Sequence, residues 1–448
     1  MISGGPSRQD GRWAGLIFDV VSEAPSLPLN GAASTPRSVY LVAVAGFPNY
    51  GDELITAGWL RQLLEQVPEA DVWVDCPHPG PAATLLHGVH PRARFVDTLW
   101  RLSWAAPTDE PWELATWIQS AIRDPGLAPR WAAGIELLRD MDVVHLVGGG
   151  YIHGTWPRHV GLLAGAAATA RQFGARAAMT GHGLVPSGDD MAALLATLAD
   201  QFDTVDVRDE ASGELLRSAG LDRVTVSADD AFLALPTHLA PLPEASPAPE
   251  FMLCAQSDML GVERARLAGL VSQTLRAWQV APENLGIVEG VPRIDREVYA
   301  LLEHELPGAR FYPFSEVWRD GLPVRPGQTW LSTRFHPHLV AAAAGASGVA
   351  IPVSQDYYLT KHNSLVALGS RWTVADKLSV PDRPTAGGFP PGVIRACHAA
   401  KTRLAQTIYG RRKRSLDTGR TGEDAHVTAA PAESSGGPSD RRWMRSRR

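Results

Sequence analysis

Short apolar runs alternate with amphipathic segments along most of the chain. The run SVYLVAVAG, which starts at Ser38, has the near-continuous apolar character of a buried parallel strand, and LITAGWLRQLLEQV after it has the period of a helix. Further strand-like runs follow, with helical segments between them: ADVWVDC, ARFVDTL, MDVVHLV, ARAAMT, DTVDV and VTVSA. This alternation predicts an α/β fold with a mainly parallel, doubly wound sheet and right-handed crossovers.

The same alternation restarts after a Pro-rich polar stretch, PTHLAPLPEASPAP, which spans residues 236–249. Strand-like runs such as EFMLCA and NLGIVEG again precede helical segments. We therefore predict two Rossmann-like domains, residues 37–235 and 250–409, joined by a linker over 236–249. A last helix, over residues 393–408, is long enough to cross back to the first domain.

The two ends of the chain differ from this pattern. Residues 1–36 are rich in Gly, Ser and Pro without a sustained period, which predicts a disordered leader. The only apolar run there, AGLIFDVV, is broken by Asp19, so we do not predict a signal peptide. Residues 410–448 hold ten Lys/Arg and five Asp/Glu but few apolar residues to bury, which predicts a disordered basic tail.

Charge and cysteine content narrow the functional classes. The formal net charge is −6, so the chain without its basic tail carries −11, which argues against nucleic acid as the partner of the folded part. The basic tail remains compatible with peripheral contact with a membrane surface. The three cysteines are widely spaced and form no CxxC pattern, which indicates neither a disulfide framework nor a zinc site and favours a cytoplasmic location. No apolar run reaches the roughly 18 residues needed to span a bilayer.

One insertion interrupts the strand and helix rhythm. Residues 100–131 hold five tryptophans: Trp100, Trp104, Trp112, Trp117 and Trp131. Packing in the core or at the surface is the favoured interpretation, and lining an acceptor groove is the alternative.

Three polar or glycine-rich loops follow predicted strands of the first domain. They are Asn49-Tyr50-Gly51-Asp52, Gly148-Gly149-Gly150 and Gly181-His182-Gly183. Carboxyl ends of parallel strands meet at one edge of a sheet, where ligands bind, so we expect the three loops to converge on a ligand. Glycines would let the backbone approach that ligand closely. Asp52 is also a good helix N-cap, so capping and chemistry both stay open for it.

Basic residues and histidines gather at comparable strand ends. Arg208 closes the strand DTVDV, while Arg334 and His336 lie where a strand over 330–333 meets a helix over 336–344. Lys361 begins the next helix, after a strand over 349–353. Guanidinium groups bind carboxylates and phosphates, and His336 can serve as an acid or base. A local salt bridge for Arg208 and a structural role for a histidine before proline are the alternatives; the joint placement favours one anionic ligand.

These residues occur within an ordered set of motifs: NYGDELI, GGGYIHG, GHGLVP, VRDEAS, ADDAF and TRFHPHLVAAAAG, followed by a Tyr/Lys segment. In order and spacing the set resembles the polysaccharide pyruvyl transferase family over residues 38–369. Arg208, His336 and Lys361 fall on family positions associated with phosphoenolpyruvate. The family's Gln-Gly-x-Gly-Pro is here Gly181–Pro186, with His182, and its Asp-Pro-Ala-Phe is Asp229–Phe232; residues 250–330 show no matching motif.

The resemblance implies two Rossmann-like domains facing across a cleft, a glycosyltransferase-B-like fold, with the first domain on the acceptor side and the second on the donor side. It also implies transfer of the pyruvyl group of phosphoenolpyruvate onto a sugar as a ketal, with release of phosphate. We then expect His336 to act as acid, and Arg208, Arg334 and Lys361 to hold the donor. Asp52 is a candidate base, and Asn49, Gly51, Gly149, Gly150 and His182 are candidates for the cleft loops.

Two other functions remain open at this stage. One is a nucleotide-sugar-dependent glycosyltransferase on the same fold, and the other is a non-catalytic binding protein that retains the cleft. We expect no cofactor and no metal, because the resemblance implies phosphoenolpyruvate as a donor substrate and the sequence offers no clear ligand cluster. The acceptor, whether a polymer, a lipid-linked precursor or a smaller glycoside, is left open.

Overall fold

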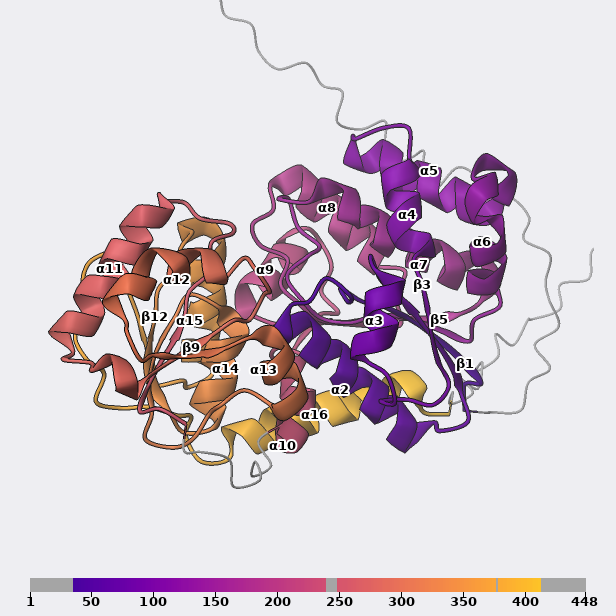
Figure 1. Ribbon diagram of the computed structural model, residues 1–448. Coiled ribbons are helices and arrows are strands. Elements are labelled where there is room, and N and C mark those ends of the chain that lie inside the picture. Colours follow the sequence, from indigo (N-terminus) through magenta and orange to yellow (C-terminus); the bar gives the residue numbers. More distant parts are fainter. Residues whose placement is uncertain (1–34, 239–247, 376–377, 412–448) are drawn as a thin grey trace, which may run out of the picture. The chain divides into compact units, whose positions relative to one another are not determined.

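The computed structural model describes residues 35–238, 248–375 and 378–411. Within these ranges two parallel sheets are each flanked by helices (Figure 1), and both belong to one compact unit of the chain. The prediction of two Rossmann-like α/β domains is therefore confirmed. Most of the predicted leader (up to residue 34), most of the predicted linker (239–247) and the predicted basic tail (from residue 412) lie outside the described residues.

The first sheet has seven parallel strands in the order β3-β2-β1-β4-β5-β6-β7. Its strands are β1 (Ser38–Val42), β2 (Asp71–Asp75), β3 (Ala93–Val96), β4 (Val143–Leu146), β5 (Arg176–His182), β6 (Thr204–Val207) and β7 (Thr225–Val226). The helices between them are α2 (Tyr50–Gln66), α3 (Pro79–Leu85), α4 (Thr98–Ala105), α5 (Pro111–Arg123), α6 (Ala132–Arg139), α7 (Val160–Phe173), α8 (Asp189–Ala199), α9 (Glu210–Ser218) and α10 (Ala231–His238). Helix α10 thus extends into the first residues of the predicted linker.

The second sheet has six parallel strands in the order β10-β9-β8-β11-β12-β13. They are β8 (Phe251–Cys254), β9 (Leu285–Val288), β10 (Arg310–Tyr312), β11 (Thr329–Ser332), β12 (Ser347–Ala350) and β13 (Thr373–Val374). Its helices are α11 (Arg264–Ala277), α12 (Arg296–Leu302), α13 (Phe314–Asp320), α14 (Phe335–Ala343), α15 (Thr360–Ala367) and α16 (Val393–Tyr409), and a π-helical turn, η6 (Gln355–Leu359), leads into α15.

Each sheet has one point where the strand order reverses. In the first sheet Tyr40 on β1 pairs with Trp73 on one side and Val144 of β4 on the other, and in the second sheet β8 lies between β9 and β11. Ligands of open α/β sheets bind beyond the strand ends at such a reversal. The loops after β1, β4, β8 and β11 are therefore where the site is expected.

The buried apolar side chains form three clusters, one of which joins elements of both sheets. One cluster of buried side chains includes Leu54 and Trp59 on α2, Phe232 on α10 and Leu339 on α14. A second cluster lies on the opposite face of the first sheet, with helices α4 to α8, and a third includes residues of α11 and α12. Because the first cluster joins elements of both sheets, side chains from the two domains are packed against each other there.

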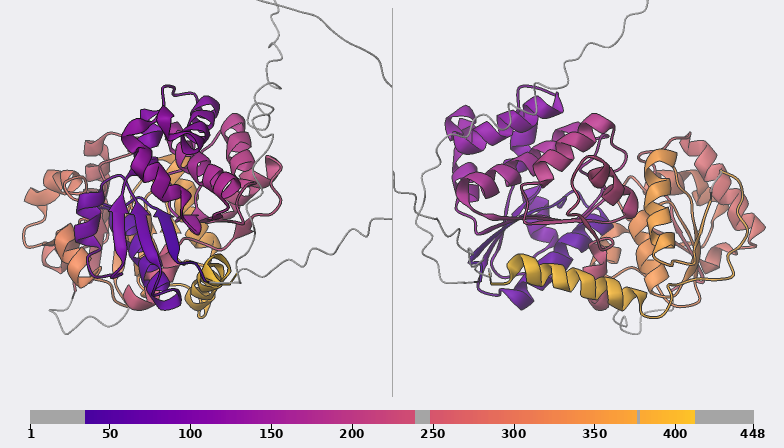
Figure 2. Two further views of the ribbon diagram at one scale, coloured as in Figure 1. Left: turned by 90° about the vertical axis from the view of Figure 1, so that its right-hand side faces the viewer. Right: turned by 180° about the vertical axis from the view of Figure 1, so that it is seen from behind.

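The last helix, α16, returns from the second domain to the first, as the sequence predicted (Figures 1 and 2). Its Lys401 is fully buried, and Nζ lies 2.9 Å from an Asp206 oxygen and 2.7 Å from an Asp230 oxygen. Near its end, the Tyr409 hydroxyl hydrogen-bonds to Nδ1 of His145 on β4. The buried ion pairs of Lys401 with Asp206 and Asp230 therefore hold α16 against the first sheet.

Buried histidines should make the fold sensitive to acid. Burial lowers the pKa of His145 to about 3, and of His182 and His362 to about 4, against about 6.5 in an unfolded chain. Below pH 6.5 the unfolded chain binds more protons than the folded one, so stability falls as the pH falls. We expect urea unfolding at pH 5 to show a loss on the order of 1–2 kcal/mol per buried histidine relative to pH 7.5. Equal midpoints at the two pH values would contradict this expectation.

Some elements differ from their predicted positions. Helix α2 begins at Tyr50 rather than Leu54, because Asn49 caps it and draws the polar loop into its first turn. Strand β12 is Ser347–Ala350, earlier than the predicted 349–353, and α13 had no counterpart in the prediction. The tryptophan-bearing insertion is largely helical. Trp100 there donates from Nε1 to the carbonyl oxygen of Ala43 at 3.1 Å.

The three cysteines, Cys76, Cys254 and Cys397, are buried and unpaired, in agreement with the absence of a predicted disulfide framework. Among the described residues no helix combines the length and the apolar character needed to cross a bilayer.

Candidate active site

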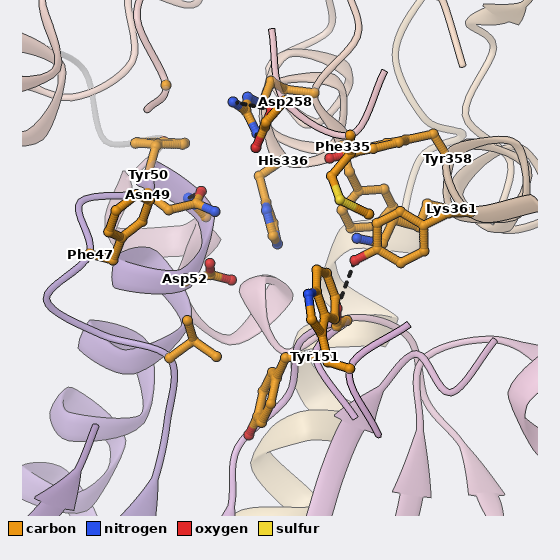
Figure 3. A pocket seen from close by; sticks show the side chains of 18 of the residues that line it. Phe47, Asn49, Tyr50, Asp52, Tyr151, Asp258, Phe335, His336, Tyr358 and Lys361 are labelled. Atoms are coloured by element: carbon orange, nitrogen blue, oxygen red, sulfur yellow. Dashed lines mark hydrogen bonds and ion pairs between the residues drawn. The ribbon is translucent and has the colours of Figure 1, made fainter. Parts of the chain in front are cut away.

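A pocket of about 350 Å³ opens between the two sheets at their strand-order reversals. Its walls come from the loops after β1, β4, β8 and β11, from Arg208 after β6 and from the η6–α15 segment. The sequence-predicted residues that line it are Asn49, Gly51, Asp52, Gly150, Arg208, Arg334, His336 and Lys361. In Figure 3 His336 points into the pocket, with Asp52 and Lys361 on different sides of it.

The N-terminus of α2 supplies one wall. The Asn49 side chain is the N-cap and accepts a hydrogen bond from the Gly51 amide at 3.2 Å. Asp52 lies in the first turn, so of the two interpretations left open for it, capping does not hold. Its carboxyl group instead lines the pocket. Burial raises the pKa of Asp52, although His336 and Lys361 nearby act in the opposite direction, so this carboxylate takes up a proton more readily than an exposed one.

His336 lies in the first turn of α14 and reaches across to the first domain. Its Nε2 is 3.6 Å from an Asp229 oxygen, and 14% of its side chain is exposed. The imidazole packs directly against Gly51, with Nδ1 the nearest ring atom. A side chain at position 51 would occupy the place of that ring, so Gly51 is needed for a histidine rather than for a ligand.

Substituting Gly51 by alanine should therefore displace His336. The added methyl group would overlap the imidazole ring, and a displacement on the order of 1 Å in a reacting group can cost about 10²-fold in rate. The matched control is Gly269→Ala, also within a helix but with open space around it, which should stabilise the protein by about 0.5–1 kcal/mol and leave activity intact. Equal activities of the two variants would contradict this account.

Arg334 is held rigidly at the β11–α14 junction. Its Nε lies 3.1 Å and 3.2 Å from the two carboxylate oxygens of Asp295, and its Nη2 lies 2.9 Å from an Asp258 oxygen. Asp295 is buried, so the guanidinium is anchored from behind while it still lines the pocket. These ion pairs fix the orientation of the guanidinium group toward a negatively charged ligand.

Arg208 is fixed by a different pair of carboxylates. Its Nε lies 3.1 Å from an Asp209 oxygen and its Nη1 3.8 Å from an Asp229 oxygen, while its guanidinium carbon lies 4.9 Å from the centre of the Phe335 ring. The local salt bridge that was the alternative interpretation is present, and Arg208 nevertheless lines the pocket. The two interpretations of this residue are therefore compatible.

Lys361 is the third basic residue of the pocket. Its Nζ lies 3.7 Å from the centre of the Tyr357 ring and 5.2 Å from that of Tyr358, both on the π-helical turn η6. The Tyr357 hydroxyl donates to the Gly150 carbonyl oxygen at 2.7 Å, and a side chain at Gly150 would crowd Lys361. Burial and the neighbouring Arg208 hold the pKa of Lys361 well below its usual range. In the part of the chain that the structure describes, Lys361 forms no ion pair with a carboxylate, so an anionic ligand would restore its charge.

Gly149 and His182 lie behind the pocket and do not line it. The two residues form a parallel bridge that extends the pairing of β4 and β5. His182 is fully buried, and its Nε2 lies 3.3 Å from the Leu146 carbonyl oxygen. They support the loop that carries Gly150 and do not contact the space in front of it.

Several groups that line the pocket or hold its lining side chains were not identified from the sequence. Asp229, Asp258 and Asp295 hold the arginines and the histidine, and Tyr357 and Trp156 form aromatic walls. Asp229 was visible within the ADDAF motif, but nothing in the motif indicated its partners. The other carboxylates lie in residues 250–330, where no motif was found.

The fold and the pocket define a class: an α/β protein with two Rossmann-like domains in a glycosyltransferase-B-like arrangement, and a small cleft with three buried or partly buried cations. A model of the polysaccharide pyruvyl transferase family matches residues 49–355, more than half of the chain. The chain belongs to the polysaccharide pyruvyl transferase family, a family of transferases.

Solved structures with similar folds share little sequence with this chain. MnaA from S. aureus, solved with UDP, is 12% identical with a TM-score of 0.46, over 83% of this chain and 90% of that one. UDP-GlcNAc 2-epimerase from Neisseria meningitidis, bound to UDP-GlcNAc, is 12% identical with a TM-score of 0.46, over 84% and 94%. The E. coli ADP-heptose LPS heptosyltransferase II is 11% identical with a TM-score of 0.36, over 82% and 98%. No curated protein sequence matches the chain.

Proposed function

We propose that this protein transfers the pyruvyl group of phosphoenolpyruvate onto two hydroxyl groups of a sugar as a ketal, and releases phosphate. The observation that carries the proposal is the convergence of Arg208, Arg334 and Lys361 around His336 in a member of this family. Phosphoenolpyruvate carries a carboxylate and a phosphate ester on the same carbon atom, and guanidinium and ammonium groups bind both. The acceptor is a carbohydrate, and the scheme uses neither a cofactor nor a metal.

The reaction begins at the methylene carbon of the donor. His336 gives its proton to that carbon as a general acid, and positive charge develops on the adjacent carbon that bears the phosphate. A sugar hydroxyl oxygen bonds to this carbon, and Asp52 takes the hydroxyl proton. The raised pKa of Asp52 suits this role, because a carboxylate that holds a proton more tightly is a stronger base.

Loss of phosphate and closure of the ketal complete the transfer. The carbon–oxygen bond to phosphate breaks with its electron pair on the phosphate, and Arg208, Arg334 and Lys361 stabilise that charge. A second hydroxyl of the same sugar then bonds to the carbon. Of the two hydroxyl protons, one returns to His336 and replaces the proton that it gave to the methyl group. The other leaves with phosphate, so atoms and charges balance.

Ligand-induced stabilisation tests the donor. A ligand that binds only the folded state at 100 times its Kd stabilises it by about 2.7 kcal/mol. We expect phosphoenolpyruvate to raise the melting temperature and nucleotide sugars to leave it unchanged. Stabilisation by a nucleotide sugar alone would favour the glycosyltransferase alternative. If neither ligand stabilised the protein and His336→Ala left cellular function intact, a non-catalytic binding protein would be favoured.

A further inference from the structure

We propose that Asp229 is the positioning residue of the site: its carboxylate orients the imidazole of His336 and joins it to Arg208 in one buried charge network. This role rests on the proposed function, in which His336 delivers a proton. Asp229 determines which ring nitrogen of His336 carries that proton. Asp229 does not line the pocket, so it would act through His336 and not by touching the substrate.

The geometry places Asp229 between the two groups. It lies just before α10 in the first domain and is 1% exposed. One of its oxygens is 3.6 Å from His336 Nε2, and the other is 3.8 Å from Arg208 Nη1. His336 comes from the second domain, so this contact forms only when the two domains meet. The Asp229 carboxylate therefore contacts both the proton donor, His336, and one of the residues that hold the anion, Arg208.

Two buried polar atoms of this network point to a role beyond packing: the Asp229 oxygen that faces Arg208, and the His336 nitrogen that faces the other Asp229 oxygen. Within the described residues, Asp229 Oδ2 and His336 Nε2 are both buried and neither has a hydrogen-bond partner. Buried polar atoms without partners are costly, and they tend to occur where a site completes its bonds during function. The Nε2 contact is slightly longer than a hydrogen bond, and catalytic hydrogen bonds often shorten when substrate binds.

Asp229 is charged under all ordinary conditions. Burial alone would raise its pKa, but the contacts with His336 and Arg208 and a hydrogen bond from the Ala231 amide together hold the pKa of Asp229 at about 2. A permanently charged oxygen opposite Nε2 favours the imidazole form with its proton on that nitrogen. The other nitrogen, Nδ1, is the ring atom nearest to Gly51, which precedes Asp52 in the pocket wall. When the ring carries a second proton, that proton resides on Nδ1, which is then the nitrogen that hands it to the donor.

Two asparagine variants distinguish this role from one in which Asp229 only holds Arg208 in place. Asp229→Asn removes the charge opposite His336, whereas Asp209→Asn removes the nearer carboxylate of Arg208 and leaves His336 untouched. Asparagine can also replace Asp209 as the N-cap of α9. We expect Asp229→Asn to lower kcat by about 10²–10⁴-fold with little change in KM for phosphoenolpyruvate. We expect Asp209→Asn to act mainly on that KM.

Nitrogen-15 NMR of the histidine rings provides a readout that needs no turnover. The His336 signals are assigned by their loss in His336→Gln. In the unaltered protein the neutral ring should carry its proton on Nε2, and in Asp229→Asn this preference should be lost. A proton on Nδ1 in the unaltered protein, or a ring unchanged by Asp229→Asn together with an unchanged kcat, would overturn the proposal. If phosphoenolpyruvate is not the donor, the kinetic assay fails for every variant while the NMR result still decides the role of Asp229.

Discussion

His336→Gln is expected to lower the rate of pyruvyl transfer by about 10²–10⁴-fold, the usual contribution of a positioned general acid. Glutamine fills similar space and can hydrogen-bond, but it cannot give a proton to carbon. Binding of phosphoenolpyruvate should persist, because Arg208, Arg334 and Lys361 are each held by other groups. Phosphate release at saturating donor measures the rate, and thermal stabilisation by donor measures binding.

The control for this variant is His304→Gln. His304 is 76% exposed on the 3₁₀ turn after α12, so its substitution should change neither rate nor binding. A His336→Gln variant that kept full activity would remove His336 from the chemistry and leave the cleft as a binding site. Loss of donor binding in the same variant would mean that His336 is an anion anchor rather than an acid.

Lys401→Met is expected to destabilise the fold by about 3–5 kcal/mol, the cost of removing one partner from a buried ion pair. Methionine leaves Asp206 and Asp230 charged and fully buried without a cation between them. Asp230 also accepts hydrogen bonds from the Trp59 indole, the Gly148 amide and the Thr180 hydroxyl, so the cluster fixes the loop that carries Gly150. Urea unfolding followed by fluorescence measures the effect.

Arg403→Met is the matched control for Lys401→Met. Arg403 lies on the same helix and is exposed, so the change should stay within about 0.5 kcal/mol. Combining Lys401→Met with Asp206→Asn should recover part of the loss, because one unpaired buried charge is then removed. Equal stability of Lys401→Met and Arg403→Met would show that the buried cluster does not fasten α16.

Much of the fold follows from local pattern. Apolar runs predicted the parallel strands, and the turn from strand to helix after β1 and β11 placed the polar residues at one sheet edge. The start of α2 could not be read in this way, because Asn49 and Asp52 are equally good caps by residue type and only the backbone geometry selects Asn49. The pairing of α16 with the first sheet depends on Lys401 finding two carboxylates distant in sequence, which periodicity does not reveal.

The sequence predicted the basic residues and the histidine of the candidate site, but not the side chains that hold them in place. Arg208, Arg334, His336 and Lys361 stand at strand or helix ends, and the structure brings all four to one pocket. The glycines were expected to make room for a ligand. Gly51 and Gly150 make room for His336 and Lys361 instead, side chains that arrive from the other domain. Contacts between domains leave no periodic signal in the sequence, and the same reason hides the role of Asp229.

The central claim is ketal transfer from phosphoenolpyruvate. The most direct test incubates the protein with phosphoenolpyruvate and a panel of sugar acceptors, and follows phosphate release and the mass of each acceptor together. The account predicts one phosphate released for each pyruvyl group gained by an acceptor, with two of its hydroxyl groups blocked and none of this in His336→Gln. Acceptor modification from a nucleotide sugar, or phosphate release without any gain in acceptor mass, would contradict it.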